Sequence, residues 1–173
     1  FVYDEGIMNG ASEYTFSPYQ TVTREMLAVI VYNMEGQPDY RGTIKFTDVN
    51  ENAWYYDGVS WAAENGIVAG YGNGIFGTGD MLTREQLVSI LYRYTDMKGI
   101  DTPTSGTAIN GFYDKNEISD YAVNSMKWAI GQGIVSGDGT GHLNPKKGAT
   151  RAEIASILSR RPSGLRKTNP HYN

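Results

Sequence analysis

The 173-residue sequence contains no cysteine, which excludes a disulfide framework and any metal site built from thiolates. It has no apolar run near the roughly 18 residues that a membrane-spanning helix needs, so we expect no membrane insertion. Basic residues are outnumbered, at 15 against 19 acidic ones, and the net charge of −4 argues against non-specific nucleic-acid binding. Local arginines, rather than the overall charge, would have to hold any anionic ligand.

Signals for catalysis and for metal binding are also missing. The two histidines, His142 and His171, lie in a loop and in the C-terminal tail, and no Ser-His-Asp or Cys-His pattern surrounds them. The segment 48–59 begins like a calcium-binding loop, but alanine and valine stand at its sixth and twelfth positions, where glycine and glutamate are needed. We therefore expect a protein with no catalytic residues, no metal and no cofactor.

One pattern is present in three copies. In the middle copy, the segment 66–94 runs from Gly-Ile-Val through a glycine-rich loop to Thr83 and then to apolar residues at helical spacing. The same Thr-Arg start recurs at Thr23, 60 positions earlier, and at Thr150, 67 positions later. Gly-Ile and a second glycine precede each start. A fixed order of loop, cap and helix at a period near 60 residues indicates an internal repeat. We term the three helices the Thr-Arg helices.

The start of each Thr-Arg helix carries its own signals. Thr83 and Thr150 are good N-cap residues. Gln86 and Glu153, three positions later, can each complete a capping box, which Met26 cannot do in the first copy. The arginine after each threonine is unusual, because a helix start already carries partial positive charge. We expect its guanidinium and free main-chain N–H groups at the helix start to hold an anion together.

These motifs, in this order, resemble the S-layer homology domain family. Its repeats run from an aromatic-x-Asp start through an aromatic-Ala helix and a Gly-Ile-x-x-Gly turn to a Thr-Arg-Ala-Glu helix. The second and third copies match over their whole length, and the first matches over its second half. The resemblance implies non-catalytic anchoring of an exported protein at the bacterial cell wall or S-layer, outside the cell. The implied partner is a secondary cell-wall polysaccharide with pyruvate ketals, or in some lineages peptidoglycan.

We therefore expect a mostly α-helical fold, with three repeats of helix, Gly-rich loop and helix around a pseudo-three-fold axis. The expected parts are the second half of repeat 1, a connector, repeat 2, a second connector, repeat 3 and a basic tail, at residues 1–35, 36–45, 46–95, 96–110, 111–160 and 161–173. The chain begins without an initiator methionine, so we expect a piece of a longer or processed protein.

The first repeat lacks the helix that opens the other two. We expect another segment, the tail or a protein neighbour to cover the apolar residues that this helix would otherwise bury, which include Met8, Leu27 and Val31.

The first candidates for ligand binding are Arg24, Arg84 and Arg151. Each could instead brace the fold by pairing with a repeat carboxylate, such as Asp48 or Asp114. The other candidates for ligand binding are these two aspartates, aromatic residues of the opening helices and loop residues, namely Asp48, Asp114, Trp54, Tyr121, Trp61, Trp128, Tyr71 and Asn73. For the two inner tryptophans the alternative is a place in the core, and for the loop residues it is ordinary turn chemistry.

Together these features and the resemblance predict a module that binds an anionic, pyruvylated wall polysaccharide through grooves between adjacent repeats. An alternative of a different class is a structural module that builds a surface layer or filament and has protein as its main partner.

Overall fold

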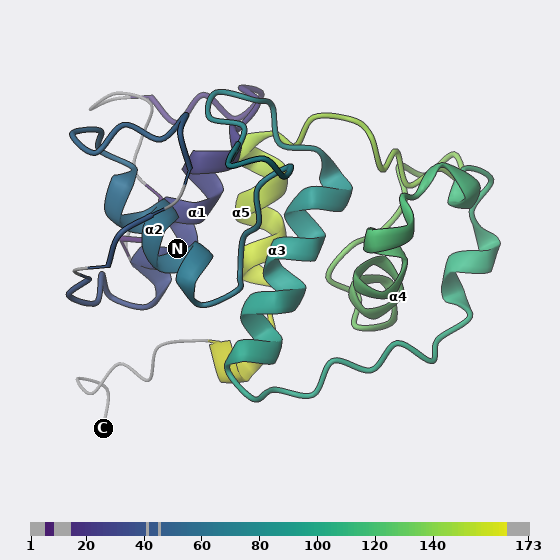
Figure 1. The fold of residues 1–173 in the computed structure, drawn as a ribbon. Coiled ribbons are helices and arrows are strands. Elements are labelled where there is room, and N and C mark those ends of the chain that lie inside the picture. Colours follow the sequence, from purple (N-terminus) through teal and green to yellow (C-terminus); the bar gives the residue numbers. More distant parts are fainter. Residues whose placement is uncertain (1–5, 9–14, 41, 45, 166–173) are drawn as a thin grey trace.

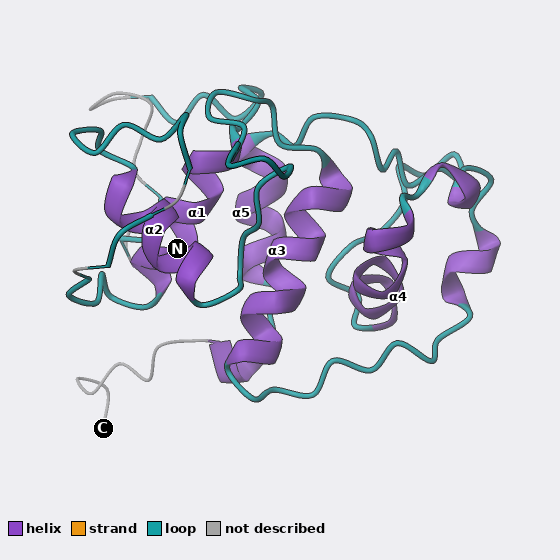
Figure 2. Cartoon of the chain, viewed as in Figure 1, coloured by secondary structure: helices purple, strands orange, loops and turns teal. Residues whose placement is uncertain are grey.

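The structure is a computed structural model that describes residues 6–8, 15–40, 42–44 and 46–165. The α-helices of this part are α1 (Arg24–Met34), α2 (Tyr56–Glu64), α3 (Arg84–Met97), α4 (Val123–Gly131) and α5 (Arg151–Ser159). Short 3-10 turns form η1 (Ala108–Gly111), η2 (Lys115–Glu117), η3 (Asp120–Ala122) and η4 (Ser163–Leu165). The described residues form isolated β-bridges but no strand (Figure 2), so the expected mostly helical fold is confirmed.

The helix starts follow the sequence signals. The Thr83 side chain caps α3, and both hydrogen bonds of the capping box with Gln86 are present. Thr150 and Glu153 form the same box at α5, whereas Thr23 makes no side-chain cap bond at α1. The predicted capping boxes are therefore confirmed, including the lack of one in the first copy.

The helices that precede the glycine loops, α2 and α4, each end shortly before a glycine. Gly66 and Gly133 follow them with φ of +69° and +66°, a left-handed conformation that glycine adopts without a steric penalty.

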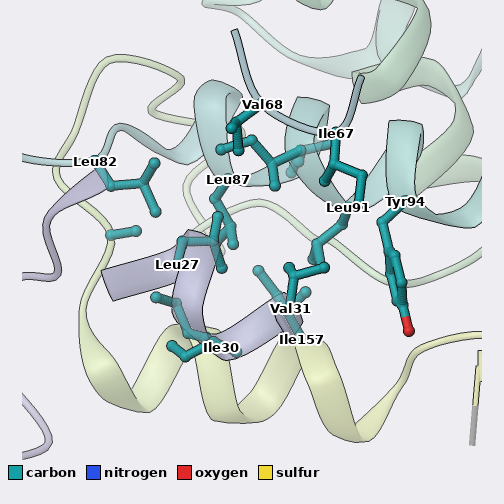
Figure 3. Close-up of a cluster of buried hydrophobic side chains, with 14 of the residues drawn as sticks. Leu27, Ile30, Val31, Ile67, Val68, Leu82, Leu87, Leu91, Tyr94 and Ile157 are labelled. Carbon is teal, nitrogen blue, oxygen red and sulfur yellow. The ribbon is translucent and has the colours of Figure 1, made fainter. Parts of the chain in front are cut away.

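The Thr-Arg helices α1, α3 and α5 contribute to one core. The apolar positions predicted to face it are all buried, namely Leu27, Ile30, Val31, Leu87, Ile90, Leu91, Ile154, Ile157 and Leu158. Figure 3 shows side chains from all three helices in contact, with Ile157 of α5 close to Val31 of α1 and Leu91 of α3. Side chains of the three helices therefore belong to one buried cluster.

A closed ring of main-chain hydrogen bonds joins the three repeats just before these helices. The N–H of Val22 donates to the carbonyl of Ala149 (3.0 Å), that of Ala149 donates to Leu82 (2.8 Å), and that of Leu82 donates to Val22 (2.9 Å). Each residue directly precedes the capping threonine of its helix, and all three are buried. Such a ring is what a pseudo-three-fold arrangement requires, although the symmetry of the whole repeats stays a prediction.

Helices pair across repeats rather than within them. The first Thr-Arg helix, α1, packs against α2 of the next repeat, and α3 packs against α4 (Figure 1). The residues expected to need outside cover, Met8, Leu27 and Val31, are all buried in this chain. The expected cover therefore exists within the chain, and on the first Thr-Arg helix it is supplied by α2 of the second repeat. Among the described residues, α5 is the Thr-Arg helix without such a partner.

Within the described part of the chain, no helix is both long and apolar enough to cross a membrane.

Most of the expected basic tail, residues 166–173, lies outside the described residues. Its described beginning is packed, because Arg161 is buried and donates from Nη1 to the carbonyl of Leu158 at 2.7 Å.

The two helix pairs meet closely at one point each. In α2, a Cβ added at Gly58 would lie 3.0 Å from Cα and 2.9 Å from Cγ2 of Val29 in α1. At the corresponding point of the second pair, the Ser89 and Ser125 hydroxyls share a buried hydrogen bond of 2.9 Å. The close approach of α1 and α2 therefore requires glycine, which has no side chain, at position 58.

We expect Gly58→Ala to lower the free energy of unfolding by about 1–3 kcal/mol, because the new methyl group cannot avoid the Val29 main chain. The matched control is Gly131→Ala in α4, where a Cβ would meet nothing within 4 Å. That change should leave stability unchanged or raise it by up to about 1 kcal/mol, since alanine favours the helix. Urea unfolding of both variants measures the difference, and equal stabilities would contradict the close-contact argument.

Candidate functional site

The side chain of Arg24 crosses from the first repeat to the glycine loop of the second. Its Nε donates to the carbonyl of Phe76 (3.0 Å) and its Nη2 donates to the carbonyl of Ala69 (2.7 Å). The guanidinium also lies over the ring of Tyr71, 4.4 Å from the ring centroid. Although it follows the helix cap, this arginine therefore interacts with a neighbouring loop rather than with its own helix.

The other two arginines make the corresponding bond. The Nε of Arg84 donates to the carbonyl of Leu143 (2.9 Å), in the loop of the third repeat. The Nε of Arg151 donates to the carbonyl of Phe16 (2.7 Å), in the first repeat. The acceptors stand at the same repeat position as Phe76. The arginines thus link repeat 1 to 2, 2 to 3 and 3 back to 1.

The suggested bracing partners, Asp48 and Asp114, are not the partners of these arginines. The Asp48 carboxylate instead accepts main-chain N–H groups of the glycine loop, at 2.7–3.0 Å, from Phe76, Gly77 and Thr78. Burial acts to raise the pKa of Asp48, but these three hydrogen bonds outweigh it and hold the pKa below its usual value. Asp114 accepts from Leu143 and Asn144 in the same way. The arginines brace the fold through carbonyl oxygens, and the aspartates shape the loops.

The expectation of free N–H groups at the helix starts was also wrong for α3. The N–H of Arg84 donates to the carbonyl of Lys147 (2.9 Å), and that of Glu85 donates to Pro145 (3.0 Å). The third N–H, of Gln86, is taken by the capping threonine. The neighbouring repeat and the capping threonine therefore satisfy these groups, and they are not available to an anion.

Each arginine lines a cavity between repeats, and we name each cavity after it. The Arg24 pocket has a volume of about 200 Å³, and its lining includes Gly70, Tyr71, Gln86, Ser89, Arg93 and Tyr121. The Arg84 pocket has a volume of about 330 Å³, and its lining includes Ser136, Asp138, Lys147, Glu153, Ser156 and Arg160. The Arg151 pocket has a volume of about 240 Å³, and its lining includes Met8, Met26, Val29, Ile30, Asn33 and Trp54.

The three pockets are built from corresponding positions but differ in charge. Gln86, Glu153 and Met26 occupy the third position of their Thr-Arg helices. Arg93 and Arg160 correspond to each other near the helix end, where the Arg151 pocket has asparagine instead. The Arg24 pocket is thus cationic, the Arg84 pocket contains both signs of charge, and the Arg151 pocket is mostly apolar.

The Arg24 pocket holds a buried cation that has no acidic partner in the described structure. Arg24 is only 5% exposed, yet its guanidinium pairs with no carboxylate of the described residues. Nε and Nη2 donate to carbonyl groups, whereas Nη1 makes no hydrogen bond within the described part of the chain. A second cation, Arg93, lines the same cavity. Because a buried charge without a counter-charge is unfavourable, the pocket suits an anion.

A buried carboxylate positions the aromatic ring at the edge of this pocket. The hydroxyl of Tyr121 donates to Oε1 of Glu85 (3.0 Å), which also accepts from Lys146 Nζ (2.6 Å). The Glu85 side chain further accepts the N–H and hydroxyl of Ser119. Burial acts to raise the pKa of Glu85, but the hydrogen bonds from Lys146, Ser119 and Tyr121 together hold that pKa below its usual value. Tyr121 is nevertheless 53% exposed and therefore accessible to a ligand.

The remaining candidates lie in different surroundings. Trp61 and Trp128 are buried at 8% and 1% exposure and line none of the three pockets, so they occupy the core. Trp54, which corresponds to Tyr121, is 64% exposed at the Arg151 pocket. Asn73 is exposed with φ of +52°, as in an ordinary turn.

Arg93 lines the Arg24 pocket but was not predicted from the sequence. An arginine on a helix face opposite the core is usually a solvated charge. The available signal was its spacing from Gln86 and Ser89, at i, i+3 and i+7, which places the three side chains along one stripe of α3. In the described residues, no group of three or more acidic, histidine or cysteine side chains could hold a metal ion.

Comparison with known proteins agrees with the repeat pattern. The family model of the S-layer homology domain matches residues 1–25, 45–88 and 111–155. A surface-layer 125 kDa protein of Lysinibacillus sphaericus is 29% identical over 91% of this chain, which covers 13% of that protein. An exoglucanase of Acetivibrio thermocellus is 30% identical over 88% of the chain, and a cellulosome-anchoring protein of the same species is 21% identical over 84%. The chain covers 14% and 33% of these two relatives.

We expect Glu85→Gln to lower the free energy of unfolding by about 1–3 kcal/mol at pH 7, because Lys146 loses its buried counter-charge. The depressed pKa of Glu85 contributes stability above the unfolded value near 4.5, and this contribution is lost as the pH falls through the folded pKa. The difference between wild type and variant should therefore shrink below pH 4.5. Tyr121→Phe, which removes a single hydrogen bond to Glu85, should show a smaller loss. Urea unfolding across pH 3–7 measures both, and a pH-independent gap would contradict the assignment.

Proposed function

The chain belongs to the S-layer homology domain family, and from this premise we propose that it anchors a larger exported protein to the bacterial cell wall without catalysing a reaction. The ligand in this proposal is an anionic wall glycan. The names of its relatives support the setting, since they include a surface-layer protein and a cellulosome-anchoring protein. The matched region is 14% of the exoglucanase. The enzymatic activity of that relative can therefore lie in the rest of its sequence.

The observation that carries the proposal is the buried Arg24 guanidinium. It is held in place by the carbonyl groups of Phe76 and Ala69, so its direction is fixed before a ligand arrives. A planar, preorganised guanidinium suits a carboxylate, whose two oxygens can accept parallel hydrogen bonds. A pyruvate ketal presents such a carboxylate on a sugar ring, which supports a pyruvylated polysaccharide as the ligand.

Aromatic residues at the same pocket suit the sugar. Tyr71 is 55% exposed beside Arg24, and Tyr121 lies on the edge of the cavity, contributed by the third repeat. Flat rings with a polar atom pack well against the apolar faces of a sugar. The pocket therefore combines one cationic anchor with two aromatic surfaces contributed by different repeats.

The assembly alternative has its own supporting observation. Tyr19 and Tyr113 are 87% and 79% exposed and line none of the three pockets. Exposed aromatic residues are enriched at protein–protein contacts. If protein were the main partner, these residues would contribute to binding and the pockets would not.

Co-sedimentation with purified wall sacculi separates the two functions. Sacculi of the producing organism are used before and after acid extraction of their secondary polysaccharide. We expect binding to be lost on extraction, because the anionic glycan is removed while the peptidoglycan remains. Equal binding to both preparations would reject the polysaccharide as the ligand. Replacing Tyr19 and Tyr113 together by serine tests the alternative, which requires that this change abolish association.

We expect Arg24→Lys to weaken binding to intact sacculi by roughly tenfold or more, because an ammonium group cannot reproduce the planar donor fork. Arg93→Ala should weaken binding in the same direction, since it removes the second cation of the pocket. Thermal unfolding establishes that each variant remains folded. Unchanged affinity in both folded variants would show that the Arg24 pocket does not hold the ligand.

A further inference from the structure

The third residue of each Thr-Arg helix determines which side chain lines the pocket together with the arginine of the preceding repeat. This residue lines the pocket in every case, as Gln86 in the Arg24 pocket, Glu153 in the Arg84 pocket and Met26 in the Arg151 pocket. The backbone around it is equivalent, because the arginine Nε bond to the next repeat recurs in all three. Differences between the pockets therefore arise from side chains at this position and near it.

In the Arg84 pocket, Glu153 performs two tasks at once. Its Oε2 accepts the N–H of Thr150 (2.8 Å), which completes the capping box of α5. Its Oε1 accepts from Nη1 of Arg84 at 2.9 Å. The side chains of this pair are only 14% and 28% exposed, so solvent and salt screen them less than a surface pair. A carboxylate of the chain itself thus occupies the donor that a ligand would need.

In the Arg24 pocket, Gln86 performs only the first task. Its Oε1 accepts the N–H of Thr83 (3.0 Å) to complete the capping box of α3. Being neutral, it supplies no counter-charge, and Nη1 of Arg24 makes no hydrogen bond within the described residues. The same nitrogen that Glu153 occupies in one pocket is therefore available in the other.

We propose that this helix position sets which pockets accept an anion, with Glu153 acting as an internal ligand that closes the Arg84 pocket. The Arg24 pocket, with Gln86, stays open to the carboxylate of an external glycan. This inference rests on the proposed function and deepens it by assigning the anion to one of two otherwise corresponding sites. Glu153 is a specificity-determining residue in this proposal.

The charges lining the two pockets agree with this assignment. The Arg24 pocket has two arginines, Arg24 and Arg93, and no carboxylate. The Arg84 pocket has three cations, Arg84, Lys147 and Arg160, together with the carboxylates Asp138 and Glu153. Making residue 153 neutral would therefore leave the Arg84 pocket with the same excess of positive charge as the Arg24 pocket.

The two pockets provide matched variants for each other. Glu153→Gln copies the residue that already completes the capping box of α3, so α5 should keep its cap. Gln86→Glu copies the residue that completes the box of α5, so α3 should keep its cap. Neither change alters a core residue, and thermal unfolding checks that both variants are folded.

Calorimetric titration tests the proposal on the chain as it stands. The probe is an N-acetylhexosamine glycoside that carries a pyruvate ketal, with the ketal-free glycoside as the control. We expect Glu153→Gln to bind one more ketal per chain than wild type. We expect Gln86→Glu to lose binding at the Arg24 pocket by roughly tenfold to a hundredfold, as for a charge-assisted pair. Adding Arg84→Ala to Glu153→Gln should remove the gained site and leave the original one.

The outcomes separate this inference from the proposed function. No ketal-dependent binding by wild type, together with no binding to sacculi, would overturn the proposed function. Ketal-dependent binding with the same number of sites in wild type and in folded Glu153→Gln would overturn the inference alone. The inference would also fail if wild type lost a site on Arg84→Ala, because that pocket would then be open despite Glu153.

Discussion

The structure depends on the closed ring of main-chain hydrogen bonds between Val22, Leu82 and Ala149. Each of these residues directly precedes the N-cap threonine of a Thr-Arg helix, so the hydrogen bonds bring the starts of the three helices together. Each arginine is thereby placed to donate to a carbonyl group of the next repeat. Main-chain bonds do not depend on side-chain identity, which explains how valine, leucine and alanine can occupy corresponding corners. Burial keeps these bonds away from water and so makes them costly to break.

A frame held by backbone atoms leaves the pocket side chains free to differ. Arg24 and Arg84 keep the same carbonyl contacts, although one pocket contains a neutral Gln86 and the other an acidic Glu153. Both of these residues complete a capping box, so the helix cap does not distinguish between them. The difference in charge acts on the arginine beside them and on what the pocket can hold. Repetition of the fold therefore does not imply repetition of the binding site.

The features that sequence predicted well are local. Apolar spacing identified the buried faces of α1, α3 and α5, and the Thr-x-x-Gln and Thr-x-x-Glu patterns identified the capping boxes. Predictions failed where the partner is distant in sequence. Asp48 was considered as an arginine partner because opposite charges attract, but loop N–H groups occupy its oxygens. The N–H groups at the start of α3 were expected to be free, but carbonyls of the third repeat accept them.

The closed ring also bears on how the chain folds during synthesis. A linear repeat protein can fold one unit at a time, because each unit contacts only its neighbours. Here the bond from Arg151 to Phe16 joins residues 135 positions apart, and contacts of such long separation slow folding. The first repeat cannot complete its contacts until the third has left the ribosome. Loss of one repeat would open the ring rather than shorten it, so we expect the three repeats to fold and unfold together.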